Sequence, residues 1–178
     1  MPPPPGGPYH PSMPVIQLVN SEPTLADART LFSEYGKFLG ATQACGYFSH
    51  PDFEREIATL PAPYTDHAGQ ILLRYVQGAA AACIAYRKNV LEGPATCEIK
   101  RLYVRPSYRG HGLARQLVAD VLLRAGASNY NRIILDTDLA HMPGAFDLYT
   151  CFGFKEFGTR RGSIAFFELP LIPATPAH

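Results

Sequence analysis

The sequence lacks any long hydrophobic run and any strong excess of one charge. No stretch approaches the roughly 20 apolar residues that a helix needs to span a bilayer, and the N-terminus lacks the basic and apolar regions of a signal peptide. The formal net charge of the 178 residues is only +1. Nucleic acids and anionic membranes attract strongly basic proteins, so we expect neither as a partner. Because the sequence shows no membrane span and no signal peptide, we expect a cytoplasmic protein.

Cysteine is scarce, and the possible metal ligands are scattered. The four cysteines form no CxxC pair, and the six histidines show no HxH or HxxxH spacing. Zinc sites and thiol redox motifs need closely spaced ligands, so we expect neither. The cysteines are Cys45, Cys83, Cys97 and Cys151; we expect them to be small buried hydrophobes in a reducing compartment. The chain also has no Gly-x-Ser-x-Gly motif.

Proline is concentrated at the two ends of the chain. Residues 1–14 hold seven prolines and two glycines, and such a segment buries too little surface to offset the entropy of ordering it. We therefore expect a disordered Pro-rich arm over 1–14, one folded domain over 15–169 and a Pro-rich tail over 170–178. A role of the arm as a polyproline ligand remains open.

Hydrophobic periodicity divides residues 15–169 into strands and helices. The predicted class is α+β, with a mixed sheet of about seven strands flanked by about four helices. The predicted strands cover 15–19, 71–76, 80–86, 97–104, 132–136, 155–157 and 164–169. The predicted helices cover 24–39, 51–60, 113–125 and 143–153, and Pro61 and Pro63 are expected to end the second of them.

A glycine-rich turn lies between a predicted strand and a predicted helix. It reads Arg109-Gly110-His111-Gly112-Leu113-Ala114. Free backbone amides and the positive end of the helix dipole make such a junction suitable for a phosphate or pyrophosphate. A Walker A loop needs Gly-Lys-Ser/Thr, and a Rossmann turn needs glycine where Arg115 stands. From these residues alone, an ordinary tight turn is the more frequent explanation.

Three segments together resemble the GNAT superfamily of N-acetyltransferases. They are residues 98–106 (EIKRLYVRP), 108–114 (YRGHGLA) and 148–154 (LYTCFGF). Leu135-Asp136-Thr137, followed by Met142, is similar to the small-molecule branch of that family. The resemblance covers roughly residues 15–169 and implies the acyl-CoA N-acyltransferase fold.

The resemblance also implies a binding mode for acetyl-CoA as co-substrate, with no metal. In the family, the strand before the glycine turn separates from the next parallel strand, and its free backbone groups bind the pantetheine. Here those groups belong to Leu102, Tyr103 and Val104. An N–H near Leu102 would polarise the thioester carbonyl. The pyrophosphate would lie on the amides of Arg109, Gly110, His111, Gly112, Leu113 and Ala114.

Two side chains are expected to carry the chemistry. The amine must lose a proton before it can attack, which costs about 4 kcal/mol at pH 7 for a pKa near 10. Glu98 resembles the strand glutamate that some relatives use as base; ordered water as base, or a Glu98 paired with Lys100, are the alternatives. Period-two alternation places Glu98 and Val104 on one face. Tyr149 is expected to protonate the leaving thiolate; a packed aromatic residue is the alternative.

The acceptor site is less determined by the sequence. Aromatic residues of the first helices and loops can line it or fill the core: Tyr35, Phe38, Tyr47, Phe48 and Phe53. Arg87 and Lys88 can bind an acceptor carboxylate or lie in a solvated turn. His141 can line the acceptor site, and Asp147 can recognise a cationic acceptor or face water.

The expected function is acetyl transfer from acetyl-CoA to a primary amine of a small molecule or amino acid, by direct attack in a ternary complex. One alternative is a protein N-terminal or lysine acetyltransferase. Another is a catalytically silent acyl-CoA-binding regulatory module. The apolar strand over 164–169 could pair across a homodimer interface, and its alternation does not decide this.

Overall fold

The computed structural model describes residues 15–42 and 50–171. The predicted arm over 1–14, the end of the predicted tail, and Tyr47 and Phe48 lie outside these residues. Along the described chain the strands are β1 (Val15–Leu18), β2 (Gln70–Val76), β3 (Ala79–Lys88), β4 (Thr96–Val104), β5 (Arg132–Asp138), β6 (Lys155–Arg161) and β7 (Ile164–Pro170). The α-helices are α1 (Glu22–Thr42), α2 (His50–Ala58), α3 (Ala62–Thr65), α4 (Leu113–Ala127) and α5 (Ala145–Thr150).

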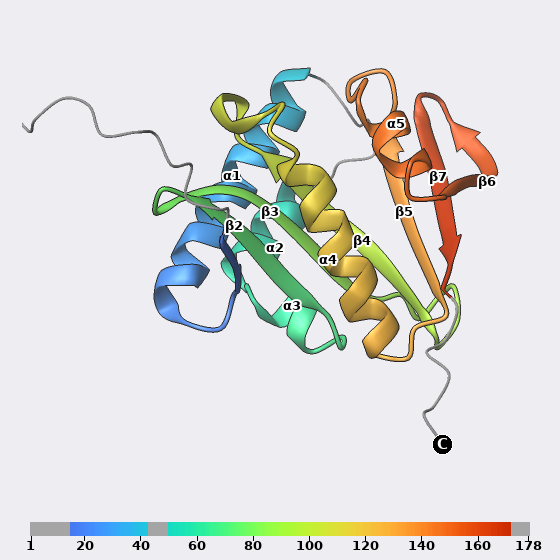
Figure 1. Ribbon diagram of the computed structural model, residues 1–178, viewed down its shortest axis with the longest axis horizontal. Coiled ribbons are helices and arrows are strands. Elements are labelled where there is room, and N and C mark those ends of the chain that lie inside the picture. The colour runs from blue at the N-terminus through green and yellow to red at the C-terminus, as the bar shows by residue number, and fades with distance from the viewer. Residues whose placement is uncertain (1–14, 43–49, 172–178) are drawn as a thin grey trace, which may run out of the picture.

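The strands form one sheet in the order β1-β2-β3-β4-β5-β7-β6. Every neighbouring pair is antiparallel except β4 and β5, which are parallel and are connected through α4 (Figure 1). The predicted α+β class with a mixed seven-stranded sheet is confirmed.

The described residues contain five α-helices, where the sequence predicted about four. The additional helix is α3, which has Pro63 in its first turn. Proline is tolerated there because its missing N–H would have no partner in any case. The prediction that Pro61 and Pro63 only end a helix was therefore wrong for Pro63.

Two other boundaries differ from the prediction. Strand β6 extends to Arg161 and is mostly exposed, so it has no apolar alternation by which its full length could be predicted. Helix α5 ends at Thr150 rather than at Gly153, because Gly153 adopts a φ of 89°. The amide of Phe154 then donates back to the Tyr149 carbonyl (3.2 Å), as at many helix ends.

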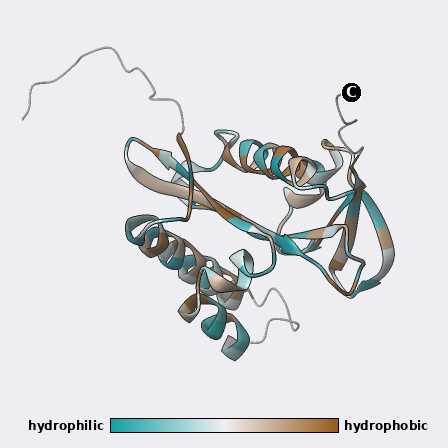
Figure 2. Ribbon diagram, turned by 90° about the horizontal axis from the view of Figure 1, so that it is seen from below, coloured by the Kyte–Doolittle hydropathy of each residue, from teal (hydrophilic) through white to brown (hydrophobic). Residues whose placement is uncertain are grey.

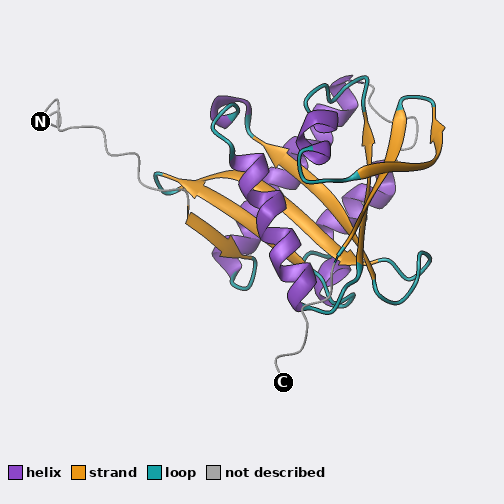
Figure 3. Cartoon of the chain, turned by 45° about the vertical axis from the view of Figure 1, so that its right-hand side comes forward, coloured by secondary structure: helices purple, strands orange, loops and turns teal. Residues whose placement is uncertain are grey.

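Each face of the sheet has its own hydrophobic core. Helices α1, α2 and α3 pack on one face, and α4 and α5 on the other. Figure 2 shows the two helical layers on opposite sides of the strands, and Figure 3 shows α4 crossing in front of them. The α4 side of the core includes Leu117, Val121 and Ile133, each fully buried.

Strand β4 changes its alternation of faces near its middle. Ala85 pairs with Lys100 and Cys83 with Tyr103, so one residue of β3 opposes two of β4. Arg101 accommodates this bulge with a φ of 60°. Cys97 and Ile99 before the bulge, and Leu102 and Val104 after it, all belong to the α4 side. Glu98 therefore faces the α1–α3 side, and the prediction that it shares a face with Val104 was wrong.

Strands β4 and β5 are paired only near their beginnings. The last paired residues are Glu98 and Ile134, although the strands continue to Val104 and Asp138. Beyond this point the two strands diverge (Figure 1). The sheet thus has a gap between the two strands, which the resemblance to the acetyltransferases led us to expect.

Candidate active site

A cleft of about 520 Å³ opens at the glycine turn, and we call it the turn cleft. Its walls come from the end of β4, the start of α4, the loop before α5 and α5 itself, with Tyr35 and Phe38 of α1 at one side. Of the nine residues predicted to bind the coenzyme, eight line it: Leu102, Tyr103, Val104, Arg109, Gly110, Gly112, Leu113 and Ala114. His111 does not, and its exposed ring lies 3.3 Å from the Tyr108 carbonyl.

The glycine turn leaves several amides available to a ligand. Gly110 and Gly112 adopt φ values of 80° and 76°, which favour glycine. Within residues 15–42 and 50–171, the amides of Gly110, His111 and Gly112 have no main-chain acceptor. Leu113 and Ala114 begin α4, where amides have no intrahelical partner. These five amides and the helix dipole suit an anion.

Arg109 differs from its neighbours in the turn. Its amide already donates to the Pro106 carbonyl (3.2 Å). Its side chain donates from Nε to the Val104 carbonyl (3.0 Å) and lies over the Phe38 ring, 5.4 Å from the centroid. Arg109 therefore lies in the wall of the turn cleft between β4 and α1, and its positive charge remains at the cleft.

The free edge of β4 faces this cleft. On its other edge, Tyr103 and Val104 pair with Cys83 and Ala82 of β3. Towards β5, the strand has no partner after Glu98. The backbone groups of residues 102–104 on that edge are thus in the position of a strand edge that can accept an extended ligand.

Tyr149 lies where the turn cleft ends. Its ring is 6% exposed and packs against Phe154 and Phe167, with centroids 5.7 and 6.3 Å away. Burial, with smaller contributions from Tyr35 and Asp136, raises the pKa of Tyr149 well above its ordinary value. The phenol therefore remains protonated and can act as a donor.

A second cavity of about 900 Å³ lies on the side of the gap away from α4, and we call it the far cavity. It is lined by the end of β3, the loop after it, Glu98 and Lys100 of β4, residues 134–136 of β5, and parts of β6 and β7. A small space of about 70 Å³, the junction, borders both. It shares Lys100 and Asp136 with the far cavity, and Leu102 and Tyr149 with the turn cleft.

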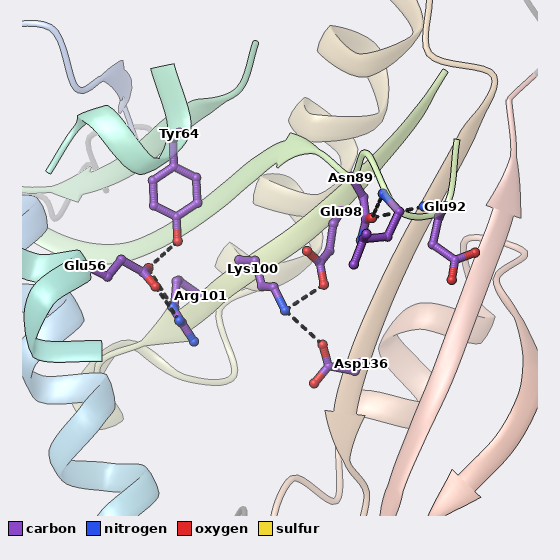
Figure 4. A network of polar contacts seen from close by, with 9 residues as sticks. Glu56, Tyr64, Asn89, Glu92, Glu98, Lys100, Arg101 and Asp136 are labelled. Atoms are coloured by element: carbon purple, nitrogen blue, oxygen red, sulfur yellow. Dashed lines mark hydrogen bonds and ion pairs between the residues drawn. The ribbon is translucent and has the colours of Figure 1, made fainter. Parts of the chain in front are cut away.

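Lys100 links the two strands at the start of the gap. Its Nζ lies 2.6 Å from Glu98 Oε1 and 3.1 Å from Asp136 Oδ1, as Figure 4 shows. Burial alone would lower the pKa of Lys100, but Asp136 and Glu98 outweigh it and raise the pKa. The lysine is therefore charged, and the three groups together carry one net negative charge.

Lys100 and Asp136 were not predicted as site residues. Both stood in segments quoted for the family resemblance, and the parallel register of β4 and β5, in which Glu98 pairs with Ile134, brings their side chains together two residues further on. Glu98 has the ion pair with Lys100 that the sequence left open as an alternative. Its role as base remains a prediction.

A buried ion pair supports β4 from the α1–α3 side. Arg101 donates to both carboxylate oxygens of Glu56, at 2.9 and 2.6 Å, and the Tyr64 hydroxyl donates to the same carboxylate. The Arg101 guanidinium also lies 4.7 Å from the Phe53 ring centroid. These contacts fix the bulged residue, and with it the main chain at Leu102.

The other predicted acceptor residues separate into three groups. Tyr35 and Phe38 line the turn cleft, and Phe53 is part of the core. Arg87 and Lys88 line the far cavity. His141 lies in the turn cleft, with Nδ1 2.9 Å from Asp138 Oδ2, and Asp147 is exposed and lines none of the three spaces.

The described residues contain neither a cluster of metal ligands nor a membrane-spanning helix. No group of three or more His, Cys, Asp or Glu side chains there could hold a metal ion. No helix in residues 15–42 and 50–171 is long and apolar enough to cross a membrane.

Comparisons with known proteins agree on one family. A sequence model described as the acetyltransferase (GNAT) family matches residues 31–154. An uncharacterized N-acetyltransferase of Schizosaccharomyces pombe is 32% identical over 141 residues, which are 79% of this chain and 82% of that protein. An N-acetylaspartate synthetase of Xenopus tropicalis is 34% identical over 83 residues, which are 47% of this chain and only 30% of that protein.

Solved structures support the same fold. An acetyltransferase of the GNAT family from Staphylococcus aureus matches with a TM-score of 0.70 at 15% identity, over 89% of this chain and all of that one. A putative acetyltransferase from Salmonella typhimurium, solved with its cofactor acetyl-CoA, matches with a TM-score of 0.68 at 17% identity, over 92% and 98%.

Proposed function

Because this chain belongs to the acetyltransferase (GNAT) family and is an acyl-CoA-dependent N-acetyltransferase, we propose that it transfers acetyl from acetyl-CoA to a primary amine of a small molecule or amino acid. The transfer is direct, in a ternary complex of enzyme, acetyl-CoA and amine. The observation that carries the proposal is that the junction shares lining residues with both the turn cleft and the far cavity.

In this proposal the turn cleft holds acetyl-CoA. The amides of residues 110–114 bind its pyrophosphate, and the free edge of β4 over residues 102–104 binds the pantetheine. The acetyl group then reaches the junction, beside Leu102 and Tyr149. A backbone N–H near Leu102 polarises the thioester carbonyl.

The amine approaches from the far cavity. It loses a proton, through water, to the carboxylates of Glu98 and Asp136, which Lys100 holds at the start of the gap. The nitrogen attacks the carbonyl carbon, and a tetrahedral intermediate forms. When the C–S bond breaks, Tyr149 donates its proton to the leaving sulfur. The nitrogen loses its second proton as the amide forms, and the phenolate regains this proton through water.

The first experiment measures thiol release from acetyl-CoA with a panel of small amines, amino acids and peptides. We expect turnover with small amines or amino acids, and intersecting lines when both substrates are varied, as direct transfer requires. Turnover restricted to peptides would support protein acetylation instead. Tight acetyl-CoA binding without turnover of any amine would support the silent module.

Substitution Tyr149→Phe tests the acid. We expect kcat to fall about a hundredfold, within the usual range for a general acid, with the Kd for acetyl-CoA nearly unchanged. Tyr75→Phe is the control, because the Tyr75 hydroxyl binds Asp27 (2.6 Å) and that tyrosine lines none of the three spaces. A Tyr149→Phe enzyme with wild-type kcat would remove the tyrosine from the mechanism.

A further inference from the structure

The far cavity contains more positive charge than its own carboxylates neutralise. Its three carboxylates already have cationic partners: Glu98 and Asp136 share Lys100, and Glu92 binds Arg132 (3.0 Å). Arg160 is held by Glu156 outside the lining. Arg161 also lines the cavity, with its guanidinium 5.6 Å from the centroid of the Phe166 ring. Arg87 and Lys88 also line the cavity. In the part of the chain that the structure describes, neither of them forms an ion pair with a carboxylate.

These two cations lie at the end of the cavity away from the junction. Along the β3–β4 ladder, Arg87 pairs with Glu98 and Lys88 with Cys97, whereas the junction begins at Ile99 and Lys100. The guanidinium of Arg87 lies 5.9 Å from the centroid of the Tyr64 ring. A guanidinium at an aromatic ring is restricted in orientation, so it offers its donors in a defined direction.

A carboxylate, Asp136, lies at the opposite end of the cavity, at the junction where the acetyl group is expected. Glu98 and Asp136 together exceed Lys100 by one charge, and Glu98 lies between the two ends, across the ladder from Arg87. A ligand that spans the cavity thus meets Asp136 at the junction and the cations Arg87 and Lys88 at β3. This distribution suits a zwitterion, with its ammonium group towards the junction.

We propose that the acceptor is an amine that also carries a carboxylate, as an amino acid does, and that Arg87 and Lys88 bind this carboxylate. The inference rests on the proposed function, since it assigns the far cavity to the acceptor. Arg87 can hold the two oxygens with parallel N–H donors, and Lys88 adds a point charge. The carboxylate contact then orients the amine towards Asp136 and the thioester.

Acceptors of other charge fit the cavity less well. A polyamine would place a second cation against Arg87 and Lys88, and like charges repel. In a peptide, the amine of a lysine side chain or of the N-terminus has no carboxylate as close to it as the carboxylate of a free amino acid is to its amine. Both classes belong in the test as competitors.

The experiment compares each of several L-amino acids with its own α-carboxamide in the thiol-release assay. An α-amine next to an amide has a pKa of about 8, so at neutral pH the amide offers more of the reactive neutral amine. An enzyme insensitive to the carboxylate would therefore prefer the amides. We expect the opposite: a kcat/KM at least about tenfold higher for the best amino acid than for its amide.

The double variant Arg87→Ala/Lys88→Ala tests the two residues directly. We expect KM for the amino acid to rise about tenfold or more with kcat little changed, and kinetics with the amide to stay near wild type. The control Lys37→Ala/Lys155→Ala also removes two positive charges, but from exposed sites that line none of the three spaces. It should keep the wild-type preference. Arg87→Lys should retain part of the preference for the amino acid over its amide.

The results separate the two proposals. No thiol release with any amine would end the proposed function itself. Turnover in which amides, polyamines or peptides equal or exceed the amino acids would leave the proposed function standing and overturn this inference. A preference for amino acids that survives in Arg87→Ala/Lys88→Ala would place the carboxylate elsewhere and also overturn it.

Discussion

At the scale of single residues, the site depends on charges shared among three groups. Lys100 holds one carboxylate from β4 and one from β5 across the start of the gap. Asp136 lines both the far cavity and the junction, whereas Glu98 lines only the far cavity. Asp136 is thus the carboxylate closer to Tyr149, and Glu98 keeps Lys100 from neutralising it completely.

If these carboxylates take the proton from the amine, their loss should depend on pH. We expect Glu98→Gln and Asp136→Asn each to lower kcat/KM by about tenfold or more near pH 7. The loss should shrink towards pH 10, where the amine is already neutral. The measurement is the pH profile of kcat/KM for a fixed amine.

Glu92→Gln provides the control for this profile. Glu92 lines the same cavity but binds Arg132 rather than Lys100, so its profile should follow that of the wild type. If all three variants had parallel profiles, ordered water would be the base without help from Glu98 or Asp136.

The buried pair of Glu56 and Arg101 gives a prediction about stability. Burial alone would raise the pKa of Glu56, but the hydrogen bond and charge of Arg101 outweigh burial and lower it. A carboxyl group whose pKa is lowered on folding stabilises the fold above its unfolded pKa of about 4.3, and this stabilisation is lost as the pH falls through the lower folded value.

We therefore expect Glu56→Gln to lower the free energy of unfolding by about 3 kcal/mol at pH 7, because it leaves the Arg101 guanidinium buried without a counter-charge. The difference from wild type should be constant above pH 6 and shrink below about pH 4. Urea unfolding across this pH range measures it. The exposed pair of Asp52 and Arg55 on α2 provides the control, and Asp52→Asn should change stability little.

At the scale of secondary-structure elements, the turn before α4 combines a backbone requirement with the proposed pyrophosphate site. Gly112 precedes α4 with a φ of 76°, and a Cβ built there would meet no atom within 4 Å. A side chain at this position is therefore unfavourable because of the positive φ, and not because it would clash with neighbouring atoms. Its Cβ would also lie in the turn whose amides face the turn cleft.

Gly112→Ala should lower the free energy of unfolding by about 1 kcal/mol and weaken acetyl-CoA binding. Gly78→Ala is a matched control, because Gly78 has a φ of 80°, equally open surroundings and a place in the distant β2–β3 hairpin. It should cost similar stability with no change in the Kd for acetyl-CoA, measured by calorimetry. Equal effects of both variants on binding would refute a ligand role for the turn.

The elements also show which parts of the structure the sequence could predict. Strands and helices with a buried face, such as β3 and α4, have clear periodicity and lie within a few residues of their predicted positions. The exposed β6 and the short α3 have little apolar pattern, so one was predicted too short and the other was missed. The α+β class with a mixed sheet was predicted from the family resemblance as much as from the hydrophobic periodicity.

The bulge in β4 could not be predicted from the sequence, and the reason is physical. Arg101 is not a residue that favours a positive φ, and its conformation is held by Glu56 from a distant helix. Since period two reverses across the bulge, the face of Glu98 was predicted wrongly. Glu98, Lys100 and Asp136 lie before the bulge or on β5, and their grouping depends on the parallel register of β4 and β5. The residue types were visible in the sequence, but the periodicity of the two strands does not specify this register.

At the scale of the whole molecule, two parts of the sheet meet through a short stretch of pairing. Strands β1 to β4 and strands β5, β7 and β6 are joined by only three residue pairs, from Thr96–Arg132 to Glu98–Ile134. An extended ligand in the gap would contact both parts. Acetyl-CoA should therefore stabilise the molecule as a whole.

At a concentration of acetyl-CoA about 100 times its Kd, we expect the free energy of unfolding to rise by about 2.7 kcal/mol. Hydrogen exchange should slow at the amides of residues 102–104 and 110–114. ADP is the comparison, because it has a pyrophosphate but no pantetheine, and it should protect only residues 110–114. Protection of neither segment by acetyl-CoA would contradict the assigned binding mode.

The turn cleft and the far cavity lie mainly on opposite faces of the sheet and meet only at the junction of about 70 Å³. If the turn cleft holds acetyl-CoA and the far cavity holds the acceptor, as proposed, each substrate has its own entrance, and neither needs the other to leave before it can enter or depart. The order of addition is then set by relative affinities and concentrations. Excess acceptor should not cause substrate inhibition by obstructing the coenzyme, and the acetylated product can diffuse away while CoA is still bound.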